Sequence, residues 1–186
     1  MTIVPLTPER WPALVDLFGE NGACHGCWCM YWRIGSGYRR QSALQNKAAF
    51  QQIVRRGPPP GLLAFVGDLP VGWCQLTPRA ELLAFDRAHA LRPVDDLPVW
   101  SISCLYVRRG YRRQGITAAL IGAAVKAARR ARAPALEAYP FDAAVSPSAT
   151  GTGYASTYAR AGFTEIARRH RARPIMRHSL KRARLR

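Results

Sequence analysis

The sequence predicts a single mixed α/β domain, and three observations carry that prediction. With 186 residues, of which 48% are apolar, the chain suits one buried core and is short for two domains. Short apolar runs typical of strands alternate with segments whose apolar residues recur at helical spacing. No internal repeat and no linker separates these segments.

Strands and helices alternate from the first residues onward. Thr7 followed by Pro8 is typical of a helix start. A later helix is expected to end at Gly57, because prolines follow it directly. The elements predicted in this half are a strand over 3–6, a helix over 7–21, a helix over 42–56 and paired strands over 62–66 and 71–76.

A long amphipathic helix dominates the second half of the chain. Ile116, Leu120 and Ala124 share one face of this helix, which is predicted over 115–132. Gly162 stands where a helix C-terminal glycine belongs. The other predicted elements are a short helix and loop over 78–98, strands over 99–107, 135–141, 163–169 and 175–180, a loop over 142–151 and a short helix over 154–161.

The composition excludes several classes of protein. The apolar content argues against a disordered chain. The longest apolar stretch, 116–128, is short for a membrane span and contains Lys126. The first residues lack the basic and apolar regions of a secretory signal. An odd number of cysteines, five, is then expected to stay reduced, so we expect a cytoplasmic protein that does not enter a membrane.

The basic excess is concentrated in two segments. Eight Lys and Arg lie in 108–132 and nine in 168–186, neither segment has an acidic residue, and together they equal the formal net charge of +17. Such segments attract anions, either phosphorylated small molecules or nucleic acid. For the C-terminal segment, including a basic tail over 181–186, a solvated basic end is favoured over a nucleic-acid site.

Residues 108–117 join a predicted strand to the long helix and suit a phosphate group. The first turn of a helix presents N–H groups without intrahelical partners at the positive end of the helix dipole. Arg112 and Arg113 bring two guanidinium groups there, and Gly115 lets the main chain approach an anion closely. An ordinary strand-to-helix turn with a basic edge is the alternative that this motif alone leaves open.

The same segment resembles the acetyl-coenzyme A signature of the GNAT family of N-acetyltransferases, which reads Arg/Gln-x-x-Gly-x-Gly/Ala after a strand ending in Val. Arg112 and Gly115 match this signature, whereas Thr117 stands where Gly or Ala is usual. The order of the predicted elements is also similar over residues 1–180. The resemblance implies one GNAT-like domain. Its twisted, mostly antiparallel sheet of six to seven strands would splay at the cofactor site, with about four flanking helices.

A second motif downstream is similar to the same family. Tyr158 and the pair Gly162-Phe163 match the family's Tyr-x-x-x-Gly-Phe, while Thr152 replaces a common Asn. The resemblance implies transfer of an acetyl group from acetyl-coenzyme A (acetyl-CoA) to an amine of a small molecule or a protein. The acetyl-CoA-binding residues that it implies are Leu105, Val107, Arg112, Arg113, Gln114, Gly115, Ile116 and Thr117.

Two proton transfers need catalytic groups. The resemblance implies that Tyr158 is the acid that assists the departing thiolate. Many members of the family that the chain resembles carry a Glu on the strand before the phosphate loop, but the strand over 99–107 contains no acid. Glu137 on the next strand is then the first remaining candidate for a base. The further candidates are Glu81, Asp142 and His25.

A segment rich in cysteine and aromatic residues follows the first predicted helix. Cys24, Cys27 and Cys29 lie near His25, but no second cysteine pair follows at zinc-ribbon spacing, so no metal is expected. Whether these thiols have a redox or a purely structural role stays open. Four aromatic residues are predicted to line the acceptor site, with core packing as an equal alternative. They are Trp28, Tyr31, Trp32 and Trp100, and Trp73 could join them.

Two other functions stay open beside an N-acetyltransferase. One is a non-catalytic acyl-CoA-binding regulator, which the missing acid on the strand over 99–107 and Thr152 favour slightly. The other is an RNA- or ribosome-associated protein that uses the Arg-rich C-terminus. The family resemblance is also compatible with a homodimer.

Overall fold

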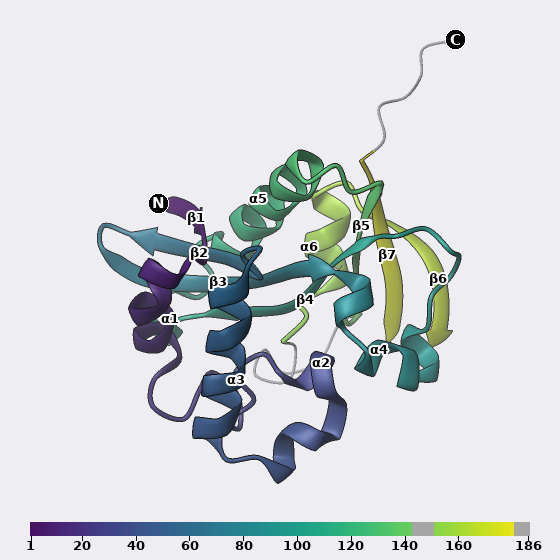
Figure 1. Ribbon diagram of the computed structural model, residues 1–186. Helices are drawn as coiled ribbons and strands as arrows, with labels where there is room; N and C mark the ends of the chain where they lie inside the picture. The colour runs from purple at the N-terminus through teal and green to yellow at the C-terminus, as the bar shows by residue number, and fades with distance from the viewer. Residues whose placement is uncertain (143–150, 181–186) are drawn as a thin grey trace.

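The protein is built around one seven-stranded sheet with the strand order β1-β2-β3-β4-β5-β7-β6 (Figure 1). The computed structural model describes residues 1–142 and 151–180. All neighbouring strands are antiparallel except β4 and β5, which run parallel. The strands are β1 (Thr2–Pro5), β2 (Gly61–Val66), β3 (Leu69–Pro78), β4 (Trp100–Val107), β5 (Ala135–Ala138), β6 (Thr164–His170) and β7 (Arg173–Ser179).

The helices cover both faces of the sheet (Figure 1). Those within the described ranges are α1 (Trp11–Phe18), α2 (Tyr31–Ile34), α3 (Ala43–Arg56), α4 (Ala84–Arg87), α5 (Ile116–Arg130) and α6 (Ala155–Arg160). Helices α5 and α6 pack on one face, and α1 and α3 pack on the other. None of these helices is long and apolar enough to cross a membrane, as judged over residues 1–142 and 151–180.

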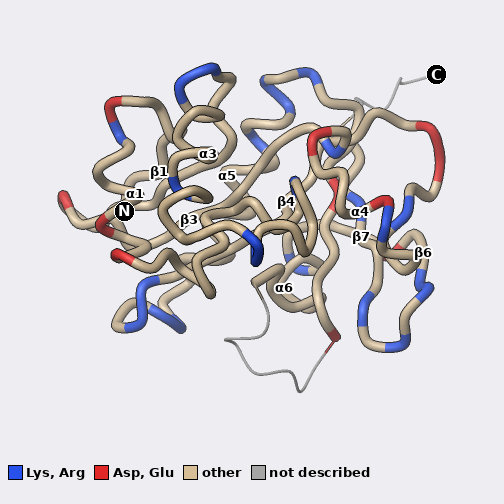
Figure 2. Tube along the Cα trace, turned by 60° about the horizontal axis from the view of Figure 1, so that its bottom comes forward, with Lys and Arg blue, Asp and Glu red and all other residues tan. Residues whose placement is uncertain are grey.

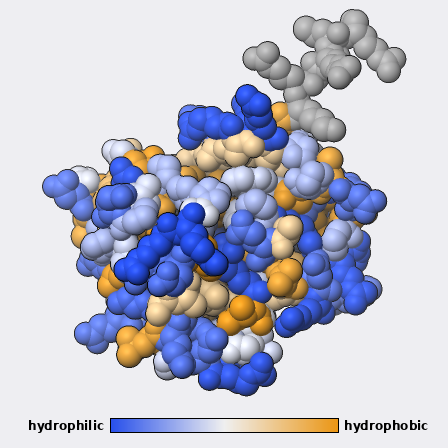
Figure 3. Space-filling view, in the orientation of Figure 1, coloured by the Kyte–Doolittle hydropathy of each residue, from blue (hydrophilic) through white to orange (hydrophobic). Residues whose placement is uncertain are grey.

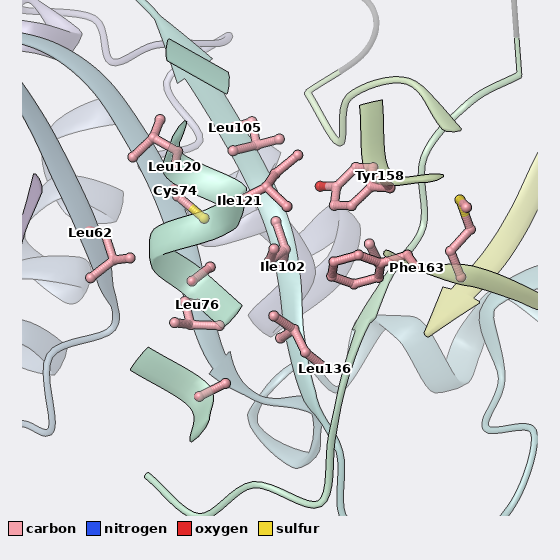
Figure 4. Packing of buried hydrophobic residues seen from close by; sticks show 14 of the residues in the cluster. Leu62, Cys74, Leu76, Ile102, Leu105, Leu120, Ile121, Leu136, Tyr158 and Phe163 are labelled. Atoms are coloured by element: carbon pink, nitrogen blue, oxygen red, sulfur yellow. The ribbon is translucent and has the colours of Figure 1, made fainter. Parts of the chain in front are cut away.

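The core beneath α5 and α6 is mainly aliphatic, and the core beneath α1 and α3 is rich in aromatic side chains. Figure 4 shows Leu120 and Ile121 of α5 against Ile102 and Leu105 of β4. Gly72 of β3 makes this approach possible, because a Cβ there would lie 2.8 Å from Ile116 Cγ2. The aromatic core on the opposite face joins the buried side chains of Trp11, Phe18, Trp28, Phe50 and Trp73.

Strands β4 and β5 separate after a short parallel contact. Their paired residues are Trp100 with Leu136, Ser101 with Glu137 and Ile102 with Ala138, after which β4 alone continues to Val107. Ser103 is an extra residue in β4, because the β3 neighbours Leu76 and Gln75 pair with Ile102 and Cys104 respectively. Such a bulge bends the strand. It therefore directs the second half of β4 away from β5.

The structure confirms the predicted mixed α/β class, the single sheet and its splayed strands. The helix over 42–56 is α3, where Ser42 and Gln45 form a reciprocal capping box (2.7 and 3.2 Å). The short helix predicted within 78–98 is α4, whereas the short helix α2 was not predicted.

Two boundaries differ from the prediction because of prolines. The helix expected over 7–21 begins as a 3-10 turn, and α1 starts only at Trp11, because Pro12 lacks the N–H that an earlier α-helical turn would need. The strand expected over 135–141 ends at Ala138, and Pro140 cannot donate to the sheet. Residues 143–150 of the predicted loop and the predicted tail over 181–186 lie outside the described residues.

Candidate active site

The N-terminus of α5 has the geometry of an anion site. Gly115 is the N-cap residue in a left-handed conformation (φ 78°), and no side chain caps the helix. A Cβ on Gly115 would meet no atom within 4 Å, so the space above the first turn is open. Arg113 is also left-handed (φ 65°), which turns the main chain between β4 and α5. The first N–H groups of α5 are therefore exposed to a ligand.

The side chains of Arg112 and Gln114 are held near the helix mouth by main-chain oxygens, and no acidic residue in the described part of the chain pairs with Arg112 or Arg113. Arg112 Nε donates to the Val107 carbonyl oxygen (3.4 Å), and Gln114 Nε2 donates to the Gly110 carbonyl oxygen (3.2 Å). Arg112, Arg113 and Gln114 are exposed, whereas Ile116 is buried and anchors the helix. The predicted phosphate-binding residues from Arg112 to Thr117 thus lie together at one end of α5.

Tyr158 lies inside the protein next to the point where β4 leaves β5. Its side chain is fully buried, and its hydroxyl has no hydrogen-bond partner among the described residues. Figure 4 shows this hydroxyl pointing toward Leu105 and Ile121. Burial, together with the neighbouring Cys74 and Cys104 thiols, raises the pKa of Tyr158 well above its ordinary value. The phenol is therefore protonated at neutral pH and can donate a hydrogen bond.

The main chain of residues 151–153 crosses the opening between the two strands. Leu105 N–H of β4 donates to the Gly151 carbonyl oxygen (2.6 Å), and Phe141 N–H donates to that of Gly153 (3.0 Å). Gly153 fits here because it is left-handed (φ 80°) and because a Cβ would lie 3.2 Å from Leu105 Cδ1 and 3.3 Å from Tyr158 Cε2. The backbone amide of Leu105, predicted to bind the cofactor, is thus bonded within the chain.

Glu137 lies on the sheet face opposite α5, in a buried polar network. Its Oε1 accepts from Arg177 Nε (2.9 Å) and Nη2 (2.6 Å), and its Oε2 accepts from the Tyr139 hydroxyl (2.8 Å). The Tyr139 hydroxyl also accepts from Arg79 Nε (3.2 Å), and Arg177 forms a second ion pair with Asp95. Both carboxylate oxygens of Glu137 are thus engaged in the fold.

Two of the other predicted base candidates are also ion-paired. Glu81 pairs with Arg33 (2.7 Å), and Asp142 pairs with Arg168. His25 lies in the loop between α1 and α2, beside a pocket of about 310 Å³ that Arg39 also lines. The structure does not bring these residues together with Tyr158.

The four predicted acceptor residues separate into two groups. Trp28 is fully buried between Trp11 and Phe18 (ring centroids at 6.0 and 5.5 Å), and Trp100 packs against the core beneath α5. Tyr31 and Trp32, with ring centroids 4.4 Å apart, instead line a pocket of about 300 Å³ between α2 and α4.

Two basic residues that the sequence analysis did not single out share this pocket. Arg39 and Arg87 line it together with Tyr31 and Trp32. Only packing between distant segments brings Arg87 of α4 beside Arg39, so no local motif marks them. Figure 3 shows a largely hydrophilic face on this side of the molecule, with apolar residues in small separate patches.

The arginines near the C-terminus are mostly used within the fold. Arg168 pairs with Asp142 and Glu165, and Arg169 donates to the carbonyl oxygens of Arg92 and Pro93. Arg177 pairs with Asp95 and Glu137. Figure 2 shows acidic positions close to the basic positions of this region. Two of the five arginines described in this segment, Arg168 and Arg177, are thus ion-paired within the fold.

The cysteines are free thiols, and none takes part in a metal site within the described residues. Cys24 is exposed, Cys27 and Cys104 are partly buried, and Cys29 and Cys74 are buried. Over residues 1–142 and 151–180, no group of three or more His, Cys, Asp or Glu side chains could hold a metal ion.

Comparison with known proteins defines the class of protein that this fold and site form. The family model described as the Acetyltransferase (GNAT) family matches residues 25–143, which is more than half of the chain. The chain therefore belongs to the GNAT acetyltransferase family, and acyl transfer is its general chemistry. A comparison with curated protein sequences gives no significant match.

Solved structures with the same fold agree with this assignment. An N-acetyltransferase from Staphylococcus aureus is 13% identical, with 97% of this chain and 98% of that chain covered and a TM-score of 0.57. A PaiA N-acetyltransferase from Thermoplasma acidophilum in complex with coenzyme A is 15% identical, with 96% and 98% covered and a TM-score of 0.56. A ribosomal-protein-alanine N-acetyltransferase from Brucella melitensis is 16% identical, with 96% and 99% covered and a TM-score of 0.56.

Proposed function

We propose that the protein transfers the acetyl group of acetyl-CoA directly to a primary amine. The observation that carries this proposal is the buried Tyr158 hydroxyl, which has no hydrogen-bond partner among the described residues and lies at the opening between β4 and β5. A buried hydroxyl without a partner costs folding free energy, so its persistence favours a role with a ligand. The uncapped N-terminus of α5 provides a site for the ligand's phosphates.

The residues of the β4–α5 turn fit the pyrophosphate of coenzyme A. In the proposal, the N–H groups of Gly115, Ile116 and Thr117 bind the phosphate oxygens, and Arg112 and Arg113 neutralise their charge. The Thr117 hydroxyl, which stands where a smaller residue is usual, can donate a further hydrogen bond. The uncapped helix start and the open space above Gly115 support this assignment.

The pantetheine arm of coenzyme A would lie along β4, between the diverging strands. Main-chain groups of Leu105 and Val107 would bind its amides. Because Leu105 N–H now bonds the Gly151 carbonyl oxygen, binding exchanges that bond for one to the ligand. The exchange replaces one amide hydrogen bond by another, so its free-energy cost is small.

In the reaction that we propose, a neutral amine attacks the thioester carbonyl carbon. A C–N bond forms, the C–S bond breaks, and coenzyme A leaves as a thiolate to which Tyr158 donates a hydrogen bond. The nitrogen loses one proton, which ends on the sulfur or in water. Because burial raises the pKa of Tyr158, hydrogen-bond donation is favoured over complete proton transfer from the phenol.

The pocket lined by Tyr31 and Trp32 is the best candidate for the acceptor. Its aromatic rings suit the apolar or cationic part of an amine, which a small molecule or a protein side chain can supply. Because Glu137, Glu81 and Asp142 are all ion-paired, we propose that the amine loses its proton to water or to a water chain. The rate should then rise with pH until the amine itself is deprotonated.

An acceptor screen tests this function. Purified protein is incubated with acetyl-CoA and a panel of amines that includes polyamines, amino acids, peptides and aminoglycosides, and thiol release is followed. The account expects at least one amine to accelerate thiol release well above hydrolysis. Tight binding of acetyl-CoA without acceleration by any amine would instead support the non-catalytic regulator.

A further inference from the structure

A cluster of thiols lies on the sheet face that carries α1 and α3. The loop between α1 and α2 contributes Cys24, Cys27 and Cys29, and β4 contributes Cys104. Cys29 belongs to the aromatic core of this face, and Cys27 and Cys104 pack against the same core. The thiols range from exposed Cys24 through partly buried Cys27 to buried Cys29.

The sheet register places Cys104 directly beside Cys29. Trp73 Nε1 donates to Cys29 Sγ (3.1 Å), and Gln75 Nε2 donates to the Cys29 carbonyl oxygen (3.2 Å), so Cys29 lies over these two residues of β3. Gln75 pairs across the antiparallel ladder with Cys104. Directly paired residues project from the same face, with Cβ atoms about 5 Å apart. Cys104 therefore lies on the face that Cys29 covers.

The two thiols also interact with one another. A hydrogen bond from Cys29 lowers the pKa of the Cys104 thiol, whereas burial raises the pKa of Cys29 and raises that of Cys27 to about 12. Cys104 is also the less buried of the two thiols, so an external disulfide meets it first, and thiolates are the nucleophiles in disulfide exchange.

We propose that Cys29 and Cys104 are a redox modification site, at which a low-molecular-weight disulfide such as oxidised glutathione produces an intramolecular disulfide. The Cys104 thiolate attacks the external disulfide and releases one small thiolate. The Cys29 thiolate then attacks the mixed disulfide, forms the Cys29–Cys104 bond and releases the second small thiolate. The protein loses two electrons and two protons, and the external disulfide is reduced to two thiols.

The cross-link would join two segments that are far apart in the sequence. It ties the loop between α1 and α2 to β4, one residue before Leu105. A disulfide that closes a long loop stabilises a protein mainly by restricting its unfolded state. For this pair, we expect the oxidised protein to melt roughly 5–10 °C higher than the reduced protein.

Thiol counting and peptide mapping on the wild-type chain test the proposal. The reduced protein is treated with oxidised glutathione, freed of excess reagent, unfolded and titrated for thiols. We expect the five thiols of the reduced chain to fall to three, with a mass lower by two hydrogen atoms. Proteolysis without reductant should give one linked pair of peptides, which carry Cys29 and Cys104, and dithiothreitol should restore all five thiols.

Matched variants separate this pair from other thiols. Cys104→Ala should keep its remaining four thiols under the same treatment, whereas Cys74→Ala should lose two. Cys74 is a suitable control because it packs in the core beneath α5, on the other face of the sheet. A mapped bond between Cys24 and Cys27, or five thiols that survive oxidation of the folded protein, would overturn the proposal. Both outcomes are independent of acetyl transfer, so they leave the proposed function to its own test.

Discussion

The hydroxyl of Tyr158 is buried and has no hydrogen-bond partner among the described residues. Leaving such a group without a partner costs about 1–3 kcal/mol of folding free energy. The hydroxyl lies beside Leu105, where the predicted path of the cofactor passes. A group of this kind is typical of functional sites, where stability is given up for a ligand contact. The Tyr158 hydroxyl is therefore better explained by contact with a ligand than by a contribution to folding stability.

Replacing Tyr158 with Phe removes the hydroxyl and keeps the packing of the ring. We expect kcat for amine acetylation to fall by about 10- to 100-fold, because the departing thiolate loses its hydrogen-bond donor. Thermal unfolding should show equal or greater stability, since an unpartnered hydroxyl disappears. Calorimetry should show nearly unchanged acetyl-CoA affinity. Full turnover by Tyr158→Phe would exclude the phenol as the donor.

Replacing Glu137 with Gln is expected to lower the stability of the protein and to leave its turnover nearly unchanged. Glu137→Gln breaks a buried ion pair and leaves Arg177 with one acidic partner, so we expect a loss of about 3 kcal/mol in unfolding free energy by urea titration. Turnover of the folded fraction should stay within about threefold of wild type, because the carboxylate is already engaged. A variant of wild-type stability that has lost turnover at neutral pH would instead support Glu137 as the base.

The residues of the candidate site divide into those that local sequence predicts and those that it does not. Arg112 and Gly115 were predictable because a basic, glycine-containing turn directly before a helix has a local physical meaning. Arg87 could not be predicted, since only the packing of α4 near α2 brings it beside Tyr31. The partnership of Glu137 with Arg177 was equally hidden, because it depends on the pairing of β5 with β7.

At the scale of elements, the β4–α5 unit makes a prediction about ligand charge. Arg112→Glu combined with Arg113→Glu should weaken acetyl-CoA binding by at least about tenfold in calorimetry, because two charge-assisted hydrogen bonds become repulsive. The matched control reverses Arg129 and Arg130 at the other end of α5. We expect the control to keep wild-type affinity. Equal affinities for all three proteins would refute the phosphate assignment.

The elements themselves were predicted best where periodicity is strong. Helix α5 has a continuous apolar face, and its observed bounds lie within two residues of the prediction. Helix α1 and strand β5 were shorter than expected, because Pro12 and Pro140 limit hydrogen bonding. The bulge at Ser103, which separates β4 from β5, leaves no clear trace in a sequence of alternating strand residues.

At the scale of the whole molecule, the high positive charge is partly offset by internal ion pairs. Hydrogen bonds from Arg168 lower the pKa of Glu165 from 4.5, and those from Arg177 lower the pKa of Asp95 from 3.8. Groups whose pKa is lower in the folded state stabilise it above their unfolded pKa and lose that effect as the pH falls. The stability of the fold should therefore decrease in acid, partly because Arg168 and Arg177 lose their charged carboxylate partners.

Thermal unfolding between pH 7 and pH 3 measures this linkage. The melting temperature should fall as the pH drops below about 4.5, where the unfolded carboxyl groups begin to bind protons before the folded ones. Arg168→Gln should flatten that fall, because the pKa of Glu165 returns toward 4.5. Parallel pH profiles for the two proteins would show that the Glu165 pair does not contribute.

The overall fold could be predicted from the sequence better than the acceptor, the oligomeric state or the location of the protein. The class, the single sheet and its splayed strands followed from the order of elements and the family resemblance, and the structure confirms them. The amine acceptor, a homodimer and a cytoplasmic location stay predictions. They depend on surfaces and on assembly, which a sequence pattern encodes only weakly.

The central claim is that acetyl-CoA lies between β4 and β5 with its sulfur at Tyr158. A crystal structure with coenzyme A tests it most directly. We predict the pyrophosphate on the N–H groups of the first turn of α5, the Leu105 amide bonded to pantetheine in place of Gly151, and the sulfur in hydrogen-bonding reach of the Tyr158 hydroxyl. Coenzyme A bound at another surface, or a sulfur separated from Tyr158 by protein, would contradict the account.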